Sequence, residues 1–183
     1  DSKIKRLISL SNMKVYAVYS DDGGHQWQYG EVAPAAIAEH ANETQMAELA
    51  DGRVLLNARS YHGNHLRKTA FSEDGGISWT PLQDTPDLTE PECQGSIISL
   101  QHDAKHSGLL YCGPENQSQR IQGTLKISLD DATSWQHIAC VYKGSFGYSS
   151  ICQLSNNEIG VMFERDNYSA ISFTRISLQN NDA

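Results

Sequence analysis

Apolar and polar residues alternate along most of this chain, and Gly, Asp and Asn interrupt the alternation at short intervals. A period of two is typical of β-strands with one buried face, and helical periodicity is nearly absent. The alternation predicts strands at 45–49, 54–59 and 66–71, with a turn at 50–52. The same order recurs downstream, with strands predicted at 96–100, 109–112, 124–128, 138–142, 149–154, 159–164 and 170–177. No segment has the composition of a linker, so we expect one all-β domain over residues 1–183.

A short pattern recurs three times between these strands. It begins at Ser20, Ser72 and Ser128, at nearly equal intervals, and reads Ser-x-Asp-x-Gly-x-Thr/Ser-Trp. Two copies depart from it, with Gln26 in place of Thr/Ser and Ala132 in place of Gly. In such a turn, Asp accepts backbone N–H bonds, Gly adopts a left-handed corner and Trp packs over the strands. The regular recurrence indicates a repeat architecture.

The pattern resembles the Asp-box of sialidases and related β-propellers, which marks a fold and carries no chemistry of its own. At about fifty residues a blade, 183 residues supply a little over three blades. Propellers close with about four to eight blades, and an unclosed one leaves sheet edges open. We therefore expect about three four-stranded antiparallel blades, as part of a larger propeller. An unusual compact domain is the alternative.

The charge balance narrows the choice of partner. A formal net charge of −8 and a pI of about 5.2 argue against nucleic acid and against an anionic membrane surface. No apolar run approaches the roughly 18 residues of a transmembrane segment. Glycosylation sequons at Asn42, Asn116 and Asn167 leave the cellular location unknown, with a secreted, periplasmic or lysosomal one favoured over the cytoplasm.

The four cysteines show neither C-x-x-C pairing nor the spacing of zinc ligands. They are Cys93, Cys112, Cys140 and Cys152. Oxidised, they would allow three connectivities, but we expect buried free thiols in strands. The histidines are scattered, so we expect neither a metal nor a cofactor.

Chemistry-bearing residues recur at matching positions of two blades. Glu43 precedes the innermost predicted strand of its blade, and Arg59 ends the second strand. Tyr148 and Glu164 stand in the same relation, at the same separation in sequence. Because the second strand runs antiparallel to the first, all four should lie at one mouth of the propeller. Arg120, in the connection between the second and third strands of the middle blade, could reach the same mouth.

Two arginines at one mouth suit a carboxylate-bearing ligand, because the planar guanidinium binds a carboxylate bidentately. Each residue taken alone also has an ordinary explanation. Arg59 could be a solvated charge, Tyr148 a rim aromatic and Glu164 part of a surface turn. Their matching positions in two blades favour a site.

Several segments resemble the sialidase family, nearest to the bacterial and lysosomal-type exo-sialidases, and together they cover essentially the whole chain. These segments are Asn42-Glu43-Thr44-Gln45-Met46, Leu49-x-Asp51-Gly52, Asn57-x-Arg59, Glu90-Pro91-x-Cys93-Gln94-x-Ser96, Gly147-Tyr148-Ser149-Ser150 and Phe163-Glu164. The resemblance implies a six-bladed propeller of the sialidase type.

The resemblance also implies roles for the five residues. Tyr148 would be the nucleophile on the anomeric carbon of sialic acid, and Glu43 its general base. Arg59 and Arg120 would be two members of an arginine triad that binds the sugar carboxylate, and Glu164 would orient a triad arginine. A neutral nucleophile suits an anomeric carbon that bears a carboxylate, and a phenol needs a base because its pKa is near 10.

Two features of the family are missing. Its first triad arginine lies in an F-R-I-P-like segment, and its acid/base aspartate also lies upstream; Arg6 lacks that context. The resemblance therefore implies the C-terminal portion of one sialidase-like domain, inactive by itself and completed by a missing N-terminal half. The expected partners are sialylated glycans or glycolipids.

Three functions remain open from the sequence. The first is an exo-α-sialidase that hydrolyses terminal sialic acid from glycoconjugates, present here as a partial catalytic domain. The alternatives are a non-catalytic sialoglycan-binding Asp-box propeller and a structural Asp-box protein without a sugar site. The pair Tyr148 and Glu43 separates the first from the second, and the two arginines separate both from the third.

Overall fold

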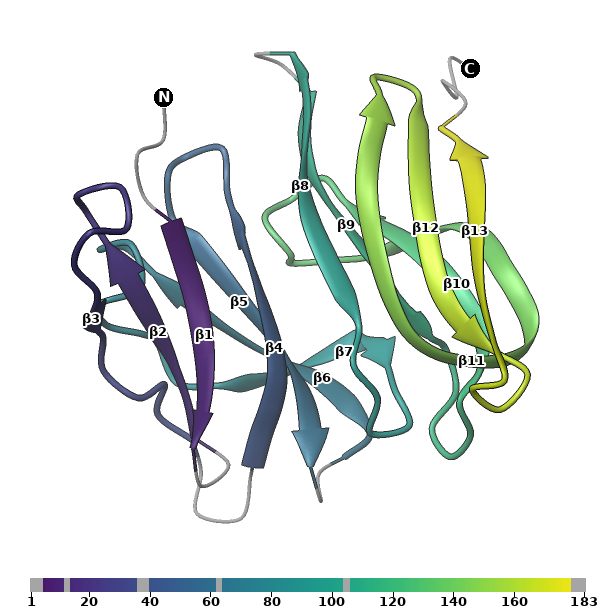
Figure 1. Ribbon diagram of the computed structural model, residues 1–183, viewed down its shortest axis with the longest axis horizontal. Helices are drawn as coiled ribbons and strands as arrows, with labels where there is room; N and C mark the ends of the chain where they lie inside the picture. Colours follow the sequence, from purple (N-terminus) through teal and green to yellow (C-terminus); the bar gives the residue numbers. More distant parts are fainter. Residues whose placement is uncertain (1–4, 12–13, 36–39, 62–63, 104–105, 179–183) are drawn as a thin grey trace.

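The chain forms antiparallel β-sheet throughout the computed structural model, which describes residues 5–11, 14–35, 40–61, 64–103 and 106–178 (Figure 1). The all-β prediction is confirmed, and no helix occurs within the described ranges. The strands are β1 (Lys5–Ser11), β2 (Lys14–Ser20), β3 (Gln28–Tyr29), β4 (His40–Glu48), β5 (Val54–Tyr61), β6 (Leu66–Ser72), β7 (Gln83–Thr89), β8 (Ser96–Asp103), β9 (His106–Pro114), β10 (Ile121–Ser128), β11 (Gln136–Ser155), β12 (Glu158–Arg165) and β13 (Ala170–Ser177).

Each sheet joins strands that are neighbours in sequence, and the sheets follow one another across the molecule (Figure 1). The orders are β1-β2-β3, β4-β5-β6-β7 and β8 through β13. The 20-residue strand β11 serves two blades, since its first half pairs with β10 and its second half with β12. Among the described residues, two blades therefore have four strands, and the blades at either end have three. Separate strands at 138–142 and 149–154 were expected wrongly, because the chain passes between blades without leaving the extended conformation.

The three Asp-boxes close equivalent turns, each following a strand near the outer edge of its blade. In the second box, the Ser72 hydroxyl donates to Asp74 Oδ1 at 2.8 Å and accepts the Gly76 N–H at 2.7 Å. Asp74 Oδ1 also accepts the Ser78 N–H at 2.9 Å. Gly76 takes the left-handed φ of 93° that the pattern predicts. The turn is thus held by its own side chains, and the other two boxes repeat the same serine and aspartate bonds.

The core consists of three apolar clusters, and each lies where one blade faces the next. They are centred on Val15, Leu56 and Trp79, on Leu55, Leu109 and Trp135, and on Leu110, Phe146 and Val161. Strand β5 is buried along most of its length, because blades cover both of its faces. Strand β13 alternates instead, with outward-facing residues exposed. Burial therefore falls from the middle blades to the last one.

All four cysteines are free thiols. Cys93 and Cys112 are buried as expected, and burial raises their pKa values to about 11 and about 12. For Cys140 and Cys152 the expectation of burial was wrong, because both lie at outward-facing positions of β11.

Among the described residues, no helix is long and apolar enough to cross a membrane. Within the same ranges, no three His, Cys, Asp or Glu side chains are grouped so that they could hold a metal.

Candidate active site

Two β-bulges, one in β4 and one in β11, place the central residues of the site. In the first, Asn42 pairs with Arg59 and Gln45 with Asn57, so two residues of β4, Glu43 and Thr44, lie opposite one of β5. Glu43 adopts a left-handed φ of 42°. A bulge redirects the side chain that it carries, and bulges are frequent beside active sites.

The second bulge lies in β11. Phe146 pairs with Arg165 and Ser149 with Phe163, so Gly147 and Tyr148 lie opposite Glu164 alone. Glu43 and Tyr148 were expected just before their strands; this was wrong, because both lie within strands that continue through the bulge. The two pairs differ by one position, because Arg59 pairs with Asn42 just before the first bulge, whereas Glu164 lies opposite the second bulge itself.

The bulges bring the two side chains together although they are 105 residues apart in sequence. The Tyr148 hydroxyl donates a hydrogen bond to Glu43 Oε1. The other carboxylate oxygen, Oε2, accepts from Arg59 Nη1 at 2.8 Å. The Glu43 carboxylate therefore lies between a phenol that can give up a proton and a guanidinium that fixes its orientation.

The electrostatics keep the Tyr148 phenol protonated. Burial and the hydrogen bond to the Glu43 carboxylate raise its pKa to about 12, while the positive charges of Arg59 and Arg120 act in the opposite direction. Ionisation at neutral pH therefore requires transfer of the proton to a base. Glu43 is the group in position to accept it.

Arg120 lies over the ring of Tyr148, with its Cζ 5.6 Å from the ring centroid. It belongs to the connection between β9 and β10, as predicted. Its guanidinium donates from Nη1 to the Tyr168 hydroxyl and from Nη2 to the carbonyl oxygen of Glu92, both at 2.9 Å. Arg59 and Arg120 therefore both lie close enough to act on Tyr148, and they come from two different blades.

Glu164 supports the backbone at Tyr148 from the neighbouring strand. Its Oε2 accepts the Tyr148 backbone N–H at 2.9 Å. A Cβ at Gly147 would lie 2.6 Å from Glu164 Oε2 and 2.9 Å from Tyr168 Cε1, so a larger residue here would displace these two side chains. The five residues selected from the sequence are thus neighbours, while the orienting of an arginine by Glu164 stays a prediction.

The segment between β7 and β8 also supports the site, and sequence reasoning gave it no role. The Gln94 side-chain amide donates to the Ser149 carbonyl oxygen at 3.1 Å and accepts the Ser149 N–H at 2.9 Å. It thereby continues the sheet pairing across two blades, beside Tyr148. Glu92, two residues earlier, supplies the carbonyl that holds Arg120. The Glu90-Pro91-x-Cys93-Gln94-x-Ser96 pattern was the signal that could have indicated this.

A fully buried ion pair anchors that segment. Glu90 accepts the Ser60 N–H at 2.7 Å and the Cys93 N–H at 2.8 Å. Arg67 lies 3.5 Å from Glu90 and donates to the Cys93 carbonyl oxygen at 2.7 Å. Because a buried charge is costly when unpaired, this network fixes the backbone that carries Glu92.

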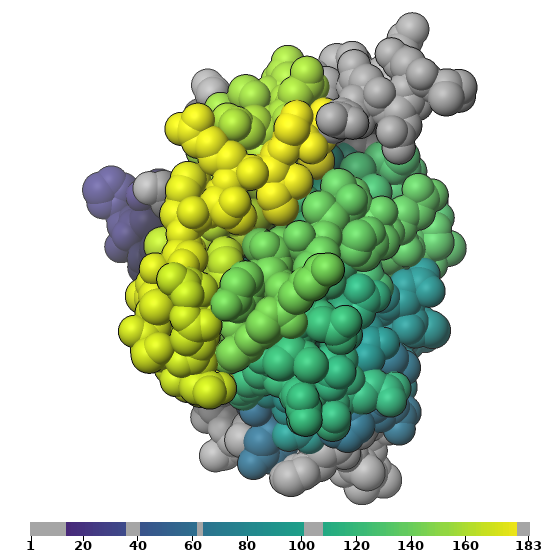
Figure 2. All heavy atoms as spheres, turned by 90° about the vertical axis from the view of Figure 1, so that its right-hand side faces the viewer, coloured from purple at the N-terminus to yellow at the C-terminus, as the bar shows by residue number. Residues whose placement is uncertain are grey.

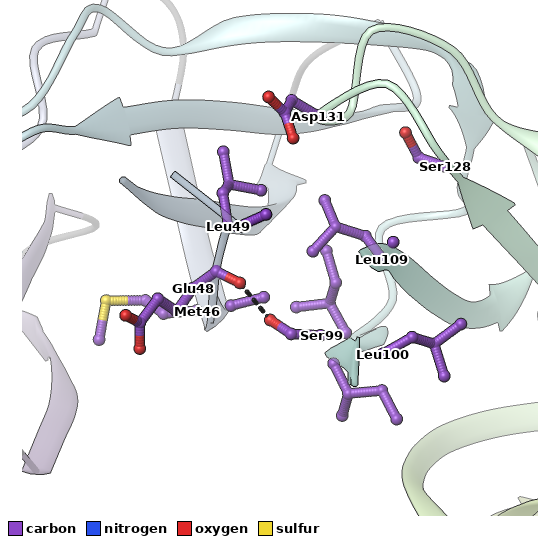
Figure 3. A pocket seen from close by; sticks show the side chains of 13 residues that line it. Met46, Glu48, Leu49, Ser99, Leu100, Leu109, Ser128 and Asp131 are labelled. Atoms are coloured by element: carbon purple, nitrogen blue, oxygen red, sulfur yellow. Dashed lines mark hydrogen bonds between the residues drawn. The ribbon is translucent and has the colours of Figure 1, made fainter. Parts of the chain in front are cut away.

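A separate hollow of about 600 Å³ lies between the middle blades, at the far end of β4 (Figure 3). Leu49, Leu100 and Leu109 form part of its wall, and the Ser99 hydroxyl hydrogen-bonds the Glu48 carbonyl oxygen beside them. None of the five candidate residues lines this hollow. It belongs to the seam between the two blades and not to the Tyr148 cluster.

Residues 7–161 match the family described as a BNR repeat-like domain. The chain is 37% identical over 153 residues to a sialidase of Micromonospora viridifaciens, a match that covers 81% of this chain and 23% of the relative. It is 30% identical over 154 residues to a sialidase of Bacteroides fragilis, a match that covers 80% of this chain and 27% of that relative. The chain thus spans about a quarter of the length of these curated relatives.

Solved structures agree with these matches. The NanB sialidase of Streptococcus pneumoniae superposes with a TM-score of 0.78 at 25% identity, over 98% of this chain and 29% of that one. The Hadza microbial sialidase Hz136 superposes with a TM-score of 0.78 at 26% identity, over 90% of this chain and 32% of that one. The architecture is accordingly that of sialidase propellers. With its Asp-boxes, its blades and these matches, the chain belongs to the BNR repeat-like family and is a member of the sialidase family.

Proposed function

We propose that this chain carries the nucleophile side of the active site of an exo-α-sialidase, a retaining glycoside hydrolase that releases terminal sialic acid. The observation that supports this most directly is the hydrogen bond from the Tyr148 hydroxyl to Glu43, with Arg59 bonded to Glu43 and Arg120 over the Tyr148 ring. The relatives named sialidases support the same activity.

The ligand follows from the charges. Two guanidinium groups from different blades favour a planar anion such as a carboxylate. In sialic acid the carboxylate is attached to the anomeric carbon, so an anionic nucleophile would approach a like charge. A phenol avoids this repulsion, and the high pKa of Tyr148 keeps it neutral until Glu43 accepts the proton.

In the proposed reaction, Tyr148 first replaces the aglycone on the sugar, and water then replaces Tyr148. Tyr148 Oη bonds to the anomeric carbon while its proton passes to Glu43 Oε1. The glycosidic C–O bond breaks, and its electron pair leaves with the aglycone oxygen, which takes a proton from an acid. Water then attacks the same carbon and gives a proton to the conjugate base of that acid, while the bond from this carbon to Tyr148 Oη breaks and the phenolate recovers its proton from Glu43. Glu164 holds the backbone of Tyr148 in place through this sequence.

We propose that other blades complete the site, because the chain spans only about a quarter of its curated relatives. They would supply the acid and the third arginine of the carboxylate site. The substrates would be sialylated glycans or glycolipids, and this chain would contribute the C-terminal portion of one propeller.

The experiment is turnover of a fluorogenic sialoside by the full-length protein and its Tyr148→Phe variant. Loss of the nucleophile should lower turnover on the order of 10³-fold or more. The exposed Tyr29 provides the control variant Tyr29→Phe, which should behave as wild type. Variant activity within tenfold of wild type would remove Tyr148 from this role. A wild type that binds free sialic acid without turnover would support the non-catalytic alternative instead.

The released sugar should be identified in the same assay. One relative, 28% identical over 176 residues, is named an anhydrosialidase, from Macrobdella decora. An anhydro product is lighter than free sialic acid by one water, so mass spectrometry separates the two. We expect free sialic acid.

A further inference from the structure

The turn between β12 and β13 brings a second tyrosine to the candidate site. Its residues Asp166, Asn167 and Tyr168 have left-handed φ angles of 53°, 52° and 67°. A non-glycine residue there costs roughly 1–2 kcal/mol, and only the short polar side chains of Asp and Asn lessen that cost. Tyr168 has no such side chain, and the residue remains 58% exposed. Burial of the ring therefore does not account for the conformation.

Two hydrogen bonds from β11 and one within the turn hold this turn in place. The Tyr142 hydroxyl donates to Asp166 Oδ1 at 3.1 Å, and Ser145 Oγ accepts the Asn167 N–H at 3.0 Å. The Ser169 hydroxyl donates to the Asp166 carbonyl oxygen at 2.8 Å. The turn is thus fixed against the strand that carries Tyr148. Backbone strain maintained in this way is concentrated at functional sites.

The result of this conformation is the contact with Arg120. The Tyr168 hydroxyl accepts from Arg120 Nη1, while the Glu92 carbonyl accepts from Nη2, so the guanidinium is held from both sides. Both acceptors are neutral. Arg59, in contrast, donates to the carboxylate of Glu43. Two carboxylates, Glu43 and Glu164, lie beside Tyr148 and could attract a loose guanidinium.

We infer that Tyr168 is a positioning residue that holds Arg120 with its charge directed to an anionic ligand and away from the neighbouring carboxylates. A guanidinium has five N–H groups, and the two neutral acceptors leave the others for a ligand carboxylate. The inference rests on the proposed function and adds to it a residue for which no role was assigned from the sequence. Tyr168 acts through Arg120 and does not take part in bond making.

The test compares Tyr168→Phe with wild type in the full-length protein. Loss of a hydrogen bond to a charged group should raise KM for a fluorogenic sialoside, and the inhibition constant of free sialic acid, about tenfold or more. Turnover at saturation should change little, because Tyr148 and Glu43 remain in place. In an Arg120→Ala background the same substitution should have no further effect. Additive effects in that cycle, or an unchanged KM, would overturn the inference.

A matched variant separates positioning from simple loosening of the turn. Asn167→Gly relieves left-handed strain at the neighbouring residue and keeps the Tyr168 hydroxyl, so KM should stay at the wild-type value. A rise in KM equal to that of Tyr168→Phe would assign the effect to the turn as a whole and overturn the role of the hydroxyl.

A measurement without substrate distinguishes failure of this inference from failure of the proposed function. The side-chain ¹⁵N signals of Arg120 should show restricted rotation in wild type and averaged signals in Tyr168→Phe. If wild type releases no sialic acid yet shows this change, the proposed function fails and the positioning role stands. If the Arg120 signals are the same in both proteins, the positioning role fails.

Discussion

Arg59 and Arg120 carry the same charge at the same mouth, but their surroundings differ. Arg59 is paired with the proposed base, at 2.8 Å, and its side chain is only 13% exposed. Arg120 is held by two neutral oxygens over the ring of Tyr148. Removal of Arg59 should therefore disturb both the base and the ligand, and removal of Arg120 mainly the ligand.

We expect Arg120→Ala to raise KM for sialosides by about 10–150-fold, since a charge-assisted hydrogen bond contributes roughly 1.5–3 kcal/mol. Arg59→Ala should raise KM similarly and also lower kcat, because Glu43 loses the partner that orients it. Inhibition by free sialic acid should weaken in both variants. Arg175→Ala, at a side chain 66% exposed, is the control. Unchanged affinity for the free acid in both variants would show that the carboxylate site lies elsewhere.

The surroundings of Tyr148 also predict how the pKa of its phenol should respond to mutation. Burial and the Glu43 carboxylate raise the Tyr148 pKa to about 12. The negative carboxylate favours the protonated phenol, so Glu43→Gln should lower the pKa of Tyr148. The same variant should be inactive, because it lacks the proposed base. Titration of ¹³C-labelled tyrosine by NMR would measure the pKa, with Tyr148→Phe to assign the signal. A pKa that rises or stays constant would contradict the proton arrangement described for this pair.

Among the elements, the Asp-box turns are the most regular, although their sequences differ. The third box has Ala132 where the pattern has glycine, and Ala132 still adopts a left-handed φ of 66°. Its N–H donates to Ser128 Oγ at 2.9 Å, as the N–H of Gly76 does to Ser72. The side-chain bonds of the box therefore impose the conformation, and alanine tolerates it at an energetic cost.

Replacing that alanine should stabilise the protein. The left-handed conformation of Ala132 costs roughly 1–2 kcal/mol, and Ala132→Gly removes this cost. The same change loses the packing of one partly buried methyl group, which offsets part of the gain. We expect the free energy of unfolding to rise by about 0.5–1 kcal/mol. Denaturant unfolding would measure it.

Gly76→Ala makes the reverse change at the corresponding position of the second Asp-box. Its φ is 93°, and a Cβ there would lie 3.1 Å from Ala17 Cβ and 3.3 Å from Trp79 Cζ2. This variant should be less stable than wild type. A destabilised Ala132→Gly would mean that the packing of the methyl group outweighs the relief of strain.

At the scale of the whole molecule, the last blade leaves one face open. Ile171 and Phe173 of β13 are 72% and 57% exposed, and Met162 of β12 is 49% exposed. Phe173 pairs directly with Met162, so the apolar side chains adjoin one another. The C-terminal strands, yellow, form part of the surface that Figure 2 shows. Exposed apolar residues on an edge strand favour association.

We therefore expect the 183-residue chain by itself to associate and to release no sialic acid, while the full-length protein is an active sialidase. Assistance by a general acid contributes about 10²–10⁴-fold, and the contacts described around Tyr148 include no candidate for it. Light scattering and sialic acid release would be measured for both proteins. Catalysis by the isolated chain as a monomer would contradict this prediction.

Much of the fold could be predicted from local patterns. The Asp-boxes appear as turns at the predicted positions, and the strand at 170–177 has the predicted bounds. The equal separations correctly selected Glu43 with Arg59, and Tyr148 with Glu164, as neighbours within their blades. These features depend on alternation and on turn chemistry within a single blade, which a short stretch of sequence contains.

The tertiary structure decided what lies between the blades. The donation from Tyr148 to Glu43, the support of Ser149 by Gln94 and the contact of Tyr168 with Arg120 each join distant parts of the chain. Such contacts depend on how bulges redirect side chains and on how one sheet packs against the next. The sequence by itself therefore determined the architecture and the residue types at the mouth. Only packing between blades determined which oxygen accepts which proton, because that depends on shifts of a few tenths of an ångström that periodicity does not encode.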